Sequence, residues 1–124
     1  MNATLKAITG LLKRDDPEEQ QAAIRVLGAI RTREPGVHKA LGELLVATDD
    51  PAIFGAILDA VEANPHEQAL KYLLKVLEDE RGQQERVLGA ISQIGGKAVR
   101  ALKTHFERVS SSTQRKMLAA LPRI

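Results

Sequence analysis

The six-residue sequence RVLGAI occurs twice in this chain, at residues 25–30 and again at residues 86–91. The two copies start 61 residues apart, and half of that offset predicts a repeat of about thirty residues. Two series of apolar residues follow this period, namely Leu27, Leu58, Leu88 and Leu118, and Ile30, Val61, Ile91 and Leu121. A repeat of this length predicts a solenoid, in which each unit buries its apolar face against its neighbours.

The spacing of apolar residues within each copy is that of a helix. Ile24, Leu27 and Ile30 follow one another at steps of three, which places them on one stripe of a helix. No stretch alternates apolar and polar residues for long enough to predict a strand. We predict eight helices, near 2–14, 17–31, 36–47, 51–63, 67–79, 83–94, 97–109 and 112–122.

Helix caps account for the short polar motifs between these segments. The Asp-Asp-Pro motifs at 15–17 and 49–51 each place an acidic cap before a proline at the first helical position. Paired carboxylates could also serve acid–base catalysis, but their position directly before proline favours capping. Three serines at 110–112 are interpreted as caps of the last helix, and the glycines at 95–96 as the end of the predicted helix at 83–94, before Lys97. The two Asp-Asp-Pro motifs are 34 residues apart, so the second unit carries a small change in length.

This helix order predicts an all-α fold, an α-solenoid of about four antiparallel helix pairs. We expect one domain over residues 1–124, with units near 1–34, 35–65, 66–95 and 96–124. A terminal unit normally has a polar outer face, whereas Met117, Leu118 and Leu121 are apolar. The sequence leaves open whether the chain is a piece of a longer protein.

The stretch PEEQQAAIRVLGAI at residues 17–30 resembles the second helix of a HEAT-like repeat. In that family the helix begins with Asp-Pro, continues with an Ala pair and ends in Leu-Gly-x-Ile-Gly. The sequence IGGKAV at 94–99 resembles the turn into the next unit, and the whole chain most resembles the short bacterial type related to phycobilisome-lyase repeats. Gln20 and Gln21 stand where the family usually has Arg, and Arg31 where it has Gly. The resemblance implies a scaffold, and it implies no lyase activity because such repeats serve many functions.

The composition restricts the chemistry and the location of the chain. There is no Cys, which excludes disulfides, thiolate zinc sites and cysteine nucleophiles and favours a reducing compartment. Residues 1–14 lack the pattern of a signal peptide, and no apolar run approaches the roughly 18 residues of a membrane span. We therefore expect a cytoplasmic protein with no membrane insertion.

Catalytic or metal chemistry finds little support in the sequence. His38, His66 and His105 fall on three different hairpins, and none has the spacing of a metal-binding pair. We interpret them as solvated surface or loop residues. The sequence predicts no enzyme, no catalytic residue, no metal and no cofactor.

Charge is distributed unevenly along the chain. Residues 1–64 carry a net charge of −3 and residues 65–124 a net charge of +5. A basic stripe could bind phosphates or an acidic protein, although such a row on a solenoid helix is usually only solvated. Nucleic-acid binders commonly add aromatic contacts, and this region offers only Phe106. Nucleic-acid or polyanion binding is thus the alternative function, through Lys97, Arg100, Lys103, Arg108, Arg115 and Lys116.

The main hypothesis is a protein-interaction scaffold that holds a protein or peptide in a groove lined by the second helix of each pair. Phe54 lies on a helix with a wide apolar arc, so it is either buried on two sides or exposed in the groove as an anchor. Gly28, Gly55 and Gly89 lie within helices, and we interpret them as sites of close helix crossing. The candidate partner-binding residues are Gln21, Arg25, Phe54, Asp59, Arg86, Gln93 and Lys116.

Overall fold

The structure is a computed structural model, and it describes residues 1–120 of the chain. Within those residues it contains eight α-helices, two short 3-10 helices and no strand. The all-α prediction is therefore confirmed. The elements are α1 (Ala3–Leu11), α2 (Pro17–Ile30), α3 (Pro35–Ala47), α4 (Pro51–Ala63), η1 (Glu67–Ala69), α5 (Leu70–Glu78), α6 (Gln84–Ile94), α7 (Gly96–His105), η2 (Phe106–Arg108) and α8 (Ser111–Ala120).

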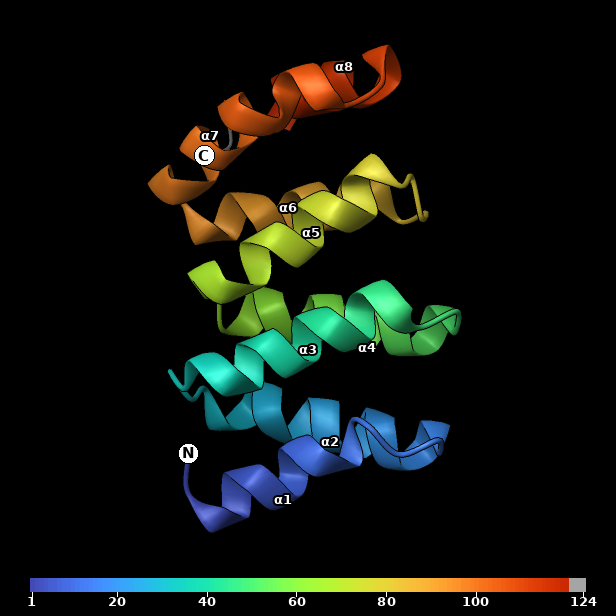
Figure 1. Cartoon of the computed structure of the whole chain (residues 1–124), viewed down its shortest axis with the longest axis vertical. Helices are drawn as coiled ribbons and strands as arrows, with labels where there is room; N and C mark the ends of the chain where they lie inside the picture. Colours follow the sequence, from blue (N-terminus) through green and yellow to red (C-terminus); the bar gives the residue numbers. More distant parts are fainter. Residues whose placement is uncertain (121–124) are drawn as a thin grey trace.

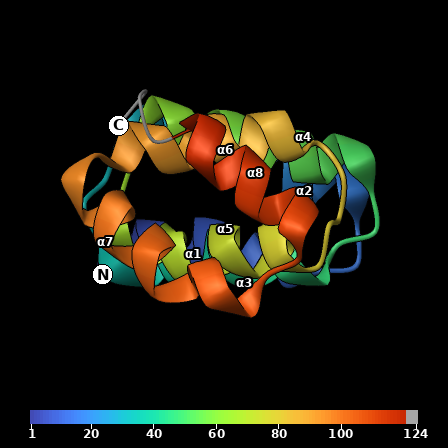
Figure 2. The same cartoon turned by 90° about the horizontal axis from the view of Figure 1, so that it is seen from above.

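The helices form two layers of a stack. Successive pairs lie one above another from α1 and α2 to α7 and α8 (Figure 1). Seen along the stack, α1, α3, α5 and α7 make one layer, and α2, α4, α6 and α8 make the other (Figure 2). Within each layer every helix contacts the next one, for example α2 with α4 and α4 with α6. This arrangement confirms the predicted α-solenoid.

The caps predicted from sequence are present. The Asp16 side chain accepts hydrogen bonds from the backbone N–H groups of Glu18 and Glu19, at 3.0 and 3.2 Å. Asp50 accepts one from Ala52 at 2.8 Å, and the Ser110 hydroxyl accepts one from Thr113 at 3.2 Å. Each carboxylate or hydroxyl satisfies a backbone donor that would otherwise lack a partner at the helix start.

The helix boundaries differ from the predicted ones at three places. The first helix ends at Leu11, because the backbone N–H groups of residues 12–14 bond three residues back and close a tight turn before Asp16. The fifth and seventh predicted helices each contain a 3-10 segment, at Glu67–Ala69 and Phe106–Arg108. The predicted end of the last helix, with Leu121, lies outside the described residues.

The leucine series of the repeat forms the spine of the core. Leu27, Leu58 and Leu88 are buried, together with Ile57 and Ile91. Burying a Leu or Ile side chain is worth about 1.5–3 kcal/mol relative to leaving it exposed. The repeat register is thus confirmed in the first three pairs, while Leu118 is exposed.

Polar side chains join each pair to the next at the same period. Asn64 Nδ2 donates to the carbonyl of Thr32 at 2.8 Å, and Arg33 donates to the carbonyl of Pro65 at 2.9 Å. Further along the stack, the Ser110 hydroxyl donates to Glu80 at 2.9 Å. The partners are 30 to 32 residues apart, so these contacts hold adjacent repeats in register.

Two histidines correct the interpretation of these residues as solvated. The rings of His38 and His66 stack with their centroids 4.1 Å apart, and both side chains are buried. His38 Nε2 lies 2.8 Å from the carbonyl oxygen of Thr32. The surface interpretation was wrong because these two residues, 28 positions apart, meet only through the stacking of repeats. His105 is half-buried, with its Nδ1 2.9 Å from Glu78 Oε1.

The mid-helix glycines have different surroundings. A Cβ atom added at Gly28 would lie 3.2 Å from the Cβ of Ala60, so the predicted close crossing is confirmed there. At Gly55 the nearest atom would be Nη1 of Arg86 at 3.1 Å, which is a side chain rather than a helix backbone. At Gly89 the nearest atom is 3.8 Å away, an ordinary contact distance that shows no close crossing.

Candidate functional site

A groove runs across the second layer of the stack. It is a cavity of about 720 Å³ between α2, α4 and the start of α6. Its floor consists mainly of residues with little or no side chain, which let another chain approach the helix backbones. These small residues are Gly28, Ala29, Ala52, Gly55, Ala56, Ala60 and Ala63.

The polar groups of the groove come from all three helices. Gln21, Arg25 and Arg31 belong to α2 or its end, and Asp59 to α4. Arg31 follows the last residue of α2 with φ of 56°, in the left-handed region. Glycine is the usual residue at this position because it has no Cβ to strain, which explains why the repeat pattern has Gly where this chain has Arg31.

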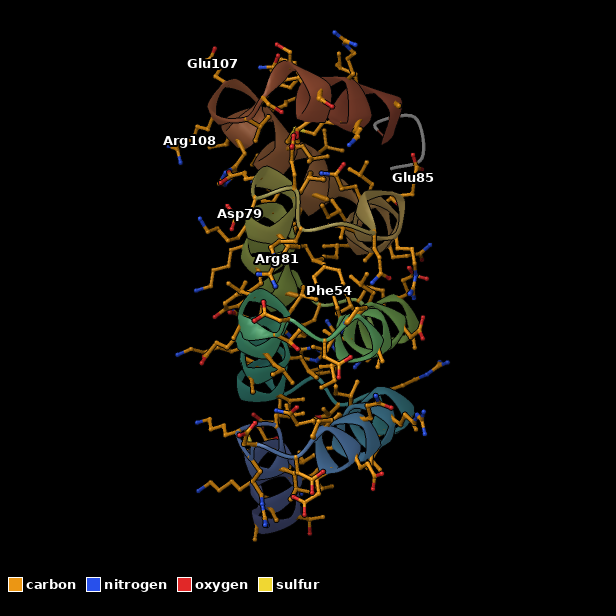
Figure 3. The ribbon with its side chains drawn as sticks, turned by 90° about the vertical axis from the view of Figure 1, so that its right-hand side faces the viewer. Phe54, Asp79, Arg81, Glu85, Glu107 and Arg108 are labelled. Atoms are coloured by element: carbon orange, nitrogen blue, oxygen red, sulfur yellow. The ribbon has the colours of Figure 1, made fainter. Side chains whose placement is uncertain are left out.

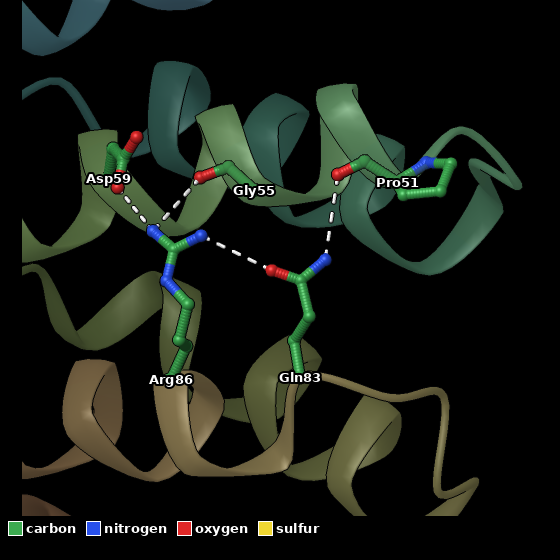
Figure 4. Close-up of polar contacts among 5 residues, drawn as sticks. All are labelled: Pro51, Gly55, Asp59, Gln83 and Arg86. Carbon is green, nitrogen blue, oxygen red and sulfur yellow. Dashed lines mark hydrogen bonds and ion pairs between the residues drawn. The ribbon is translucent and has the colours of Figure 1, made fainter.

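Arg86 is held in place by a small hydrogen-bond network (Figure 4). Its guanidinium pairs with Asp59, lies 3.4 Å from the carbonyl of Gly55, and donates to Gln83 Oε1 at 3.2 Å. Gln83 in turn lies 3.5 Å from the carbonyl of Pro51 through its Nε2. The network links α6 to α4 and closes one end of the groove.

The groove carries an excess of positive charge. Asp59 is neutralised by Arg86, whereas Arg25 and Arg31 are exposed and form no ion pair within residues 1–120. Guanidinium groups bind carboxylates through two parallel hydrogen bonds. The groove is therefore suited to a chain that offers acidic side chains.

The structure brings together some of the residues singled out from sequence. Gln21, Arg25, Asp59 and Arg86 all line the groove. Gln93 is exposed and Lys116 is half-buried, and neither lies among the groove residues.

Phe54 is the clear correction. Only 5% of this residue is exposed, and its side chain lies between the two layers (Figure 3). The prediction of an exposed groove anchor was wrong, because α4 packs against helices on both sides. The alternative that the wide apolar arc of α4 is buried on two sides is the correct one.

Sequence reasoning missed Arg31, Gln83 and the small residues of the floor. The predicted helices include Arg31 and Gln83, but both residues have a left-handed backbone just outside the observed helix ends, which helical spacing does not indicate. A comparison across repeats could have found part of the floor, since Ala29 and Ala60 recur as small residues two positions after Leu27 and Leu58.

The basic residues near the end of the chain form a separate surface. Lys97 pairs with Glu67, and this contact lowers the pKa of the Glu67 carboxyl, first through the hydrogen bond and then through the positive charge. Arg108 lies at the outer edge of the stack (Figure 3). Within the described residues, no ion pair is formed by Arg100, Lys103, Arg108, Arg115 or Lys116.

Two other features are absent from residues 1–120. No group of three or more His, Asp or Glu side chains is placed to hold a metal ion. No helix in this part of the chain combines the length and the apolar character needed to cross a bilayer.

Fold and groove define an α-solenoid repeat protein with a polar groove across its second helices. A family profile described as HEAT repeats matches residues 4–89, more than half of the chain, and the chain belongs to this family. HEAT repeats commonly act as protein-interaction scaffolds and are generally not catalytic. No curated protein and no solved structure gives a significant match. The more specific relation to phycobilisome-lyase repeats stays a prediction.

Proposed function

We propose that this protein is an interaction scaffold that holds a peptide segment of a partner protein in the groove across α2, α4 and α6. The groove supports this proposal, because it has a volume of about 720 Å³ and its floor consists mainly of small residues. Such a floor admits the backbone of an extended chain. The four helix pairs, with units near 1–34, 35–65, 66–95 and 96–124, act in this proposal as one rigid domain.

The unpaired cations of the groove favour a partner with acidic side chains. Arg25 and Arg31 lie on its α2 side, and Arg86 is already engaged by Asp59. Because Arg86 and Asp59 neutralise each other, the partner meets two free guanidinium groups.

The test is an array of peptides with acidic, neutral and basic sequences, probed with the native protein and with two variants. Arg25→Glu reverses a charge in the groove, and Lys103→Glu makes the same reversal on α7. We expect native protein and Lys103→Glu to bind the same acidic peptides and Arg25→Glu to lose them. Equal binding by all three proteins contradicts the groove as the site.

The alternative function is polyanion binding through the basic residues of α7, η2 and α8. It is supported by the five cations there without an ion pair in the described residues. A duplex DNA probe in the same experiment tests it. Phosphate contacts make affinity fall steeply with salt, so DNA binding that weakens with salt and is lost in Lys103→Glu, but not in Arg25→Glu, supports this alternative.

A further inference from the structure

The two ends of the stack expose apolar positions that are buried everywhere else in the repeat. One position is occupied by Val26, Ile57, Val87 and Met117, whose exposed fractions are 44%, 0%, 0% and 1%. The adjacent position is occupied by Leu27, Leu58, Leu88 and Leu118, with exposed fractions of 2%, 0%, 3% and 54%. The first series is thus uncovered only in the first pair, and the second series only in the last.

This pattern shows which neighbour covers each position. The Val26 position is buried in α4, α6 and α8, each of which contacts the second helix of the preceding pair. It is therefore covered from the preceding side. The Leu27 position is buried in α2, α4 and α6, so it is covered from the following side. Ile30 agrees with this reading: it is 48% exposed, whereas Val61 and Ile91 at the same position are 3% and 0% exposed.

We propose that the α8 face of one copy of this chain packs against the α2 face of another copy, so that the stack continues from molecule to molecule. Inside the chain, each residue at the Val26 position is covered by the second helix of the preceding pair, through the face that carries the Leu27-position residue of that helix. In the described residues this face is uncovered on α8, where Leu118 occupies the Leu27 position. The contact therefore repeats an interface that the protein already makes three times.

The surroundings of both faces suit this contact. On α2, Ala22 lies one turn before Val26 and is exposed; on α8, Ala119 lies beside Leu118 and is exposed. Small residues beside the apolar ones let the helices approach closely, as Gly28 and Ala60 do inside the chain. The centre of each face is uncharged, so the association persists at high salt, unlike binding to the basic surface.

A contact between two different faces does not close on itself. Each added copy leaves one α2 face and one α8 face open, so the assembly grows with concentration beyond a dimer. A symmetric contact between two α2 faces would instead stop at two copies. The order of the assembly and the behaviour of single-face variants thus distinguish these arrangements.

The experiment is sedimentation velocity over a range of concentrations, with Val26→Lys and Leu118→Lys variants. Both positions are exposed, so the variants keep the native fold, which thermal melting followed by circular dichroism verifies. We expect the native protein to grow beyond dimers and each variant alone to stay at the monomer mass of 13.5 kDa. A mixture of the two variants forms dimers and nothing larger, because one sound face of each kind remains.

Gln93→Lys is the matched control, since it adds a lysine at an exposed position of α6 outside both faces; it should assemble like the native protein. The proposal is overturned if the native protein is monomeric at every concentration. It is equally overturned if Leu118→Lys alone still dimerises, which would indicate an α2-to-α2 contact, or if the mixed variants do not associate.

Discussion

At the scale of single residues, His38 links the stability of the fold to pH. Burial lowers the pKa of His38 below its ordinary value of 6.5, and electrostatic repulsion from the neighbouring His66 and Arg33 lowers it further. The hydrogen bond to the carbonyl of Thr32 opposes this shift. The Nδ1 atom is buried without a hydrogen-bond partner, so a proton there would have no acceptor.

The sign of the pH effect follows from this shift. Between the lowered pKa of the folded state and the ordinary value of 6.5, the unfolded chain binds a proton at His38 and the folded chain does not. The contribution to stability is therefore complete above pH 6.5, and it is lost as the pH falls through the folded-state pKa.

We expect His38→Phe to weaken this pH dependence. Phenylalanine keeps a ring against His66 but cannot titrate, and the Thr32 carbonyl still accepts from Asn64. Urea unfolding at about pH 8 and about pH 5 measures the effect. The native protein should lose more free energy of unfolding between these two values than the variant. His105→Gln is the control, because it removes a half-buried histidine elsewhere in the stack. Equal losses in native protein and His38→Phe would exclude this role for His38.

Arg31 combines a backbone strain with a place in the groove. Its φ of 56° suits glycine better than a residue with a Cβ atom. Arg31→Gly should therefore raise the free energy of unfolding by up to about 1 kcal/mol. The same change removes one of the two unpaired guanidinium groups, so acidic peptides that bind the native groove should bind more weakly. Urea unfolding and the peptide array give the two readouts, and a variant that is both less stable and fully able to bind would contradict both arguments.

At the scale of single helices, periodicity and punctuation were enough to predict which segments are helical. The caps at Asp16, Asp50 and Ser110 are local, so the sequence around each one already contains the interaction. The segments predicted as helix that contain a 3-10 turn depend on neighbouring elements. The 3-10 turn at Glu67–Ala69 is an example, since it follows His66, whose ring packs on a residue of the preceding pair.

The same substitution should have opposite effects in two helices. A Cβ at Gly42 in α3 would lie 2.7 Å from Cε2 of Tyr72, with other ring atoms closer still. Gly42→Ala should destabilise the protein by about 1–3 kcal/mol, because the ring of Tyr72 must move. Gly10 in α1 has no atom within 4 Å of such a Cβ, and Gly10→Ala should stabilise by up to about 1 kcal/mol through helix propensity. Chemical denaturation of both variants checks the signs, and a stable Gly42→Ala would show that Tyr72 has room to rotate.

At the scale of the whole molecule, the repeat made part of the groove predictable. Gln21, Arg25, Asp59 and Arg86 could be assigned to one face because they lie beside the leucine series on second helices. Phe54 could not be assigned, since its exposure depends on how α4 packs against the other layer and against its neighbours in its own layer. The depth of the groove was also hidden, because it comes from small residues of two different repeats facing each other.

The core is distributed unevenly along the stack, and local stability should follow it. The middle two pairs contain most of the fully buried large side chains, such as Ile57, Leu73, Leu77 and Ile91, whereas α7 has only Ala98 and Leu102 buried. In a solenoid each unit is held mainly by its neighbours, so an end unit with a thin core can open without the rest.

Native-state hydrogen exchange at low protein concentration should therefore show fastest amide exchange in α7 and α8, slower exchange in α1, and slowest exchange in α4, α5 and α6. Raising the concentration should slow exchange in α2 and α8 selectively, because end-to-end packing covers those two helices, while the amides of α3 and α5 keep their rates. Leu118→Lys is the control that should abolish this concentration dependence without changing the order of the helices. Uniform protection from α1 to α8 at low concentration would mean that the four pairs unfold as a single cooperative unit, and that the thin core of the last pair does not limit its stability.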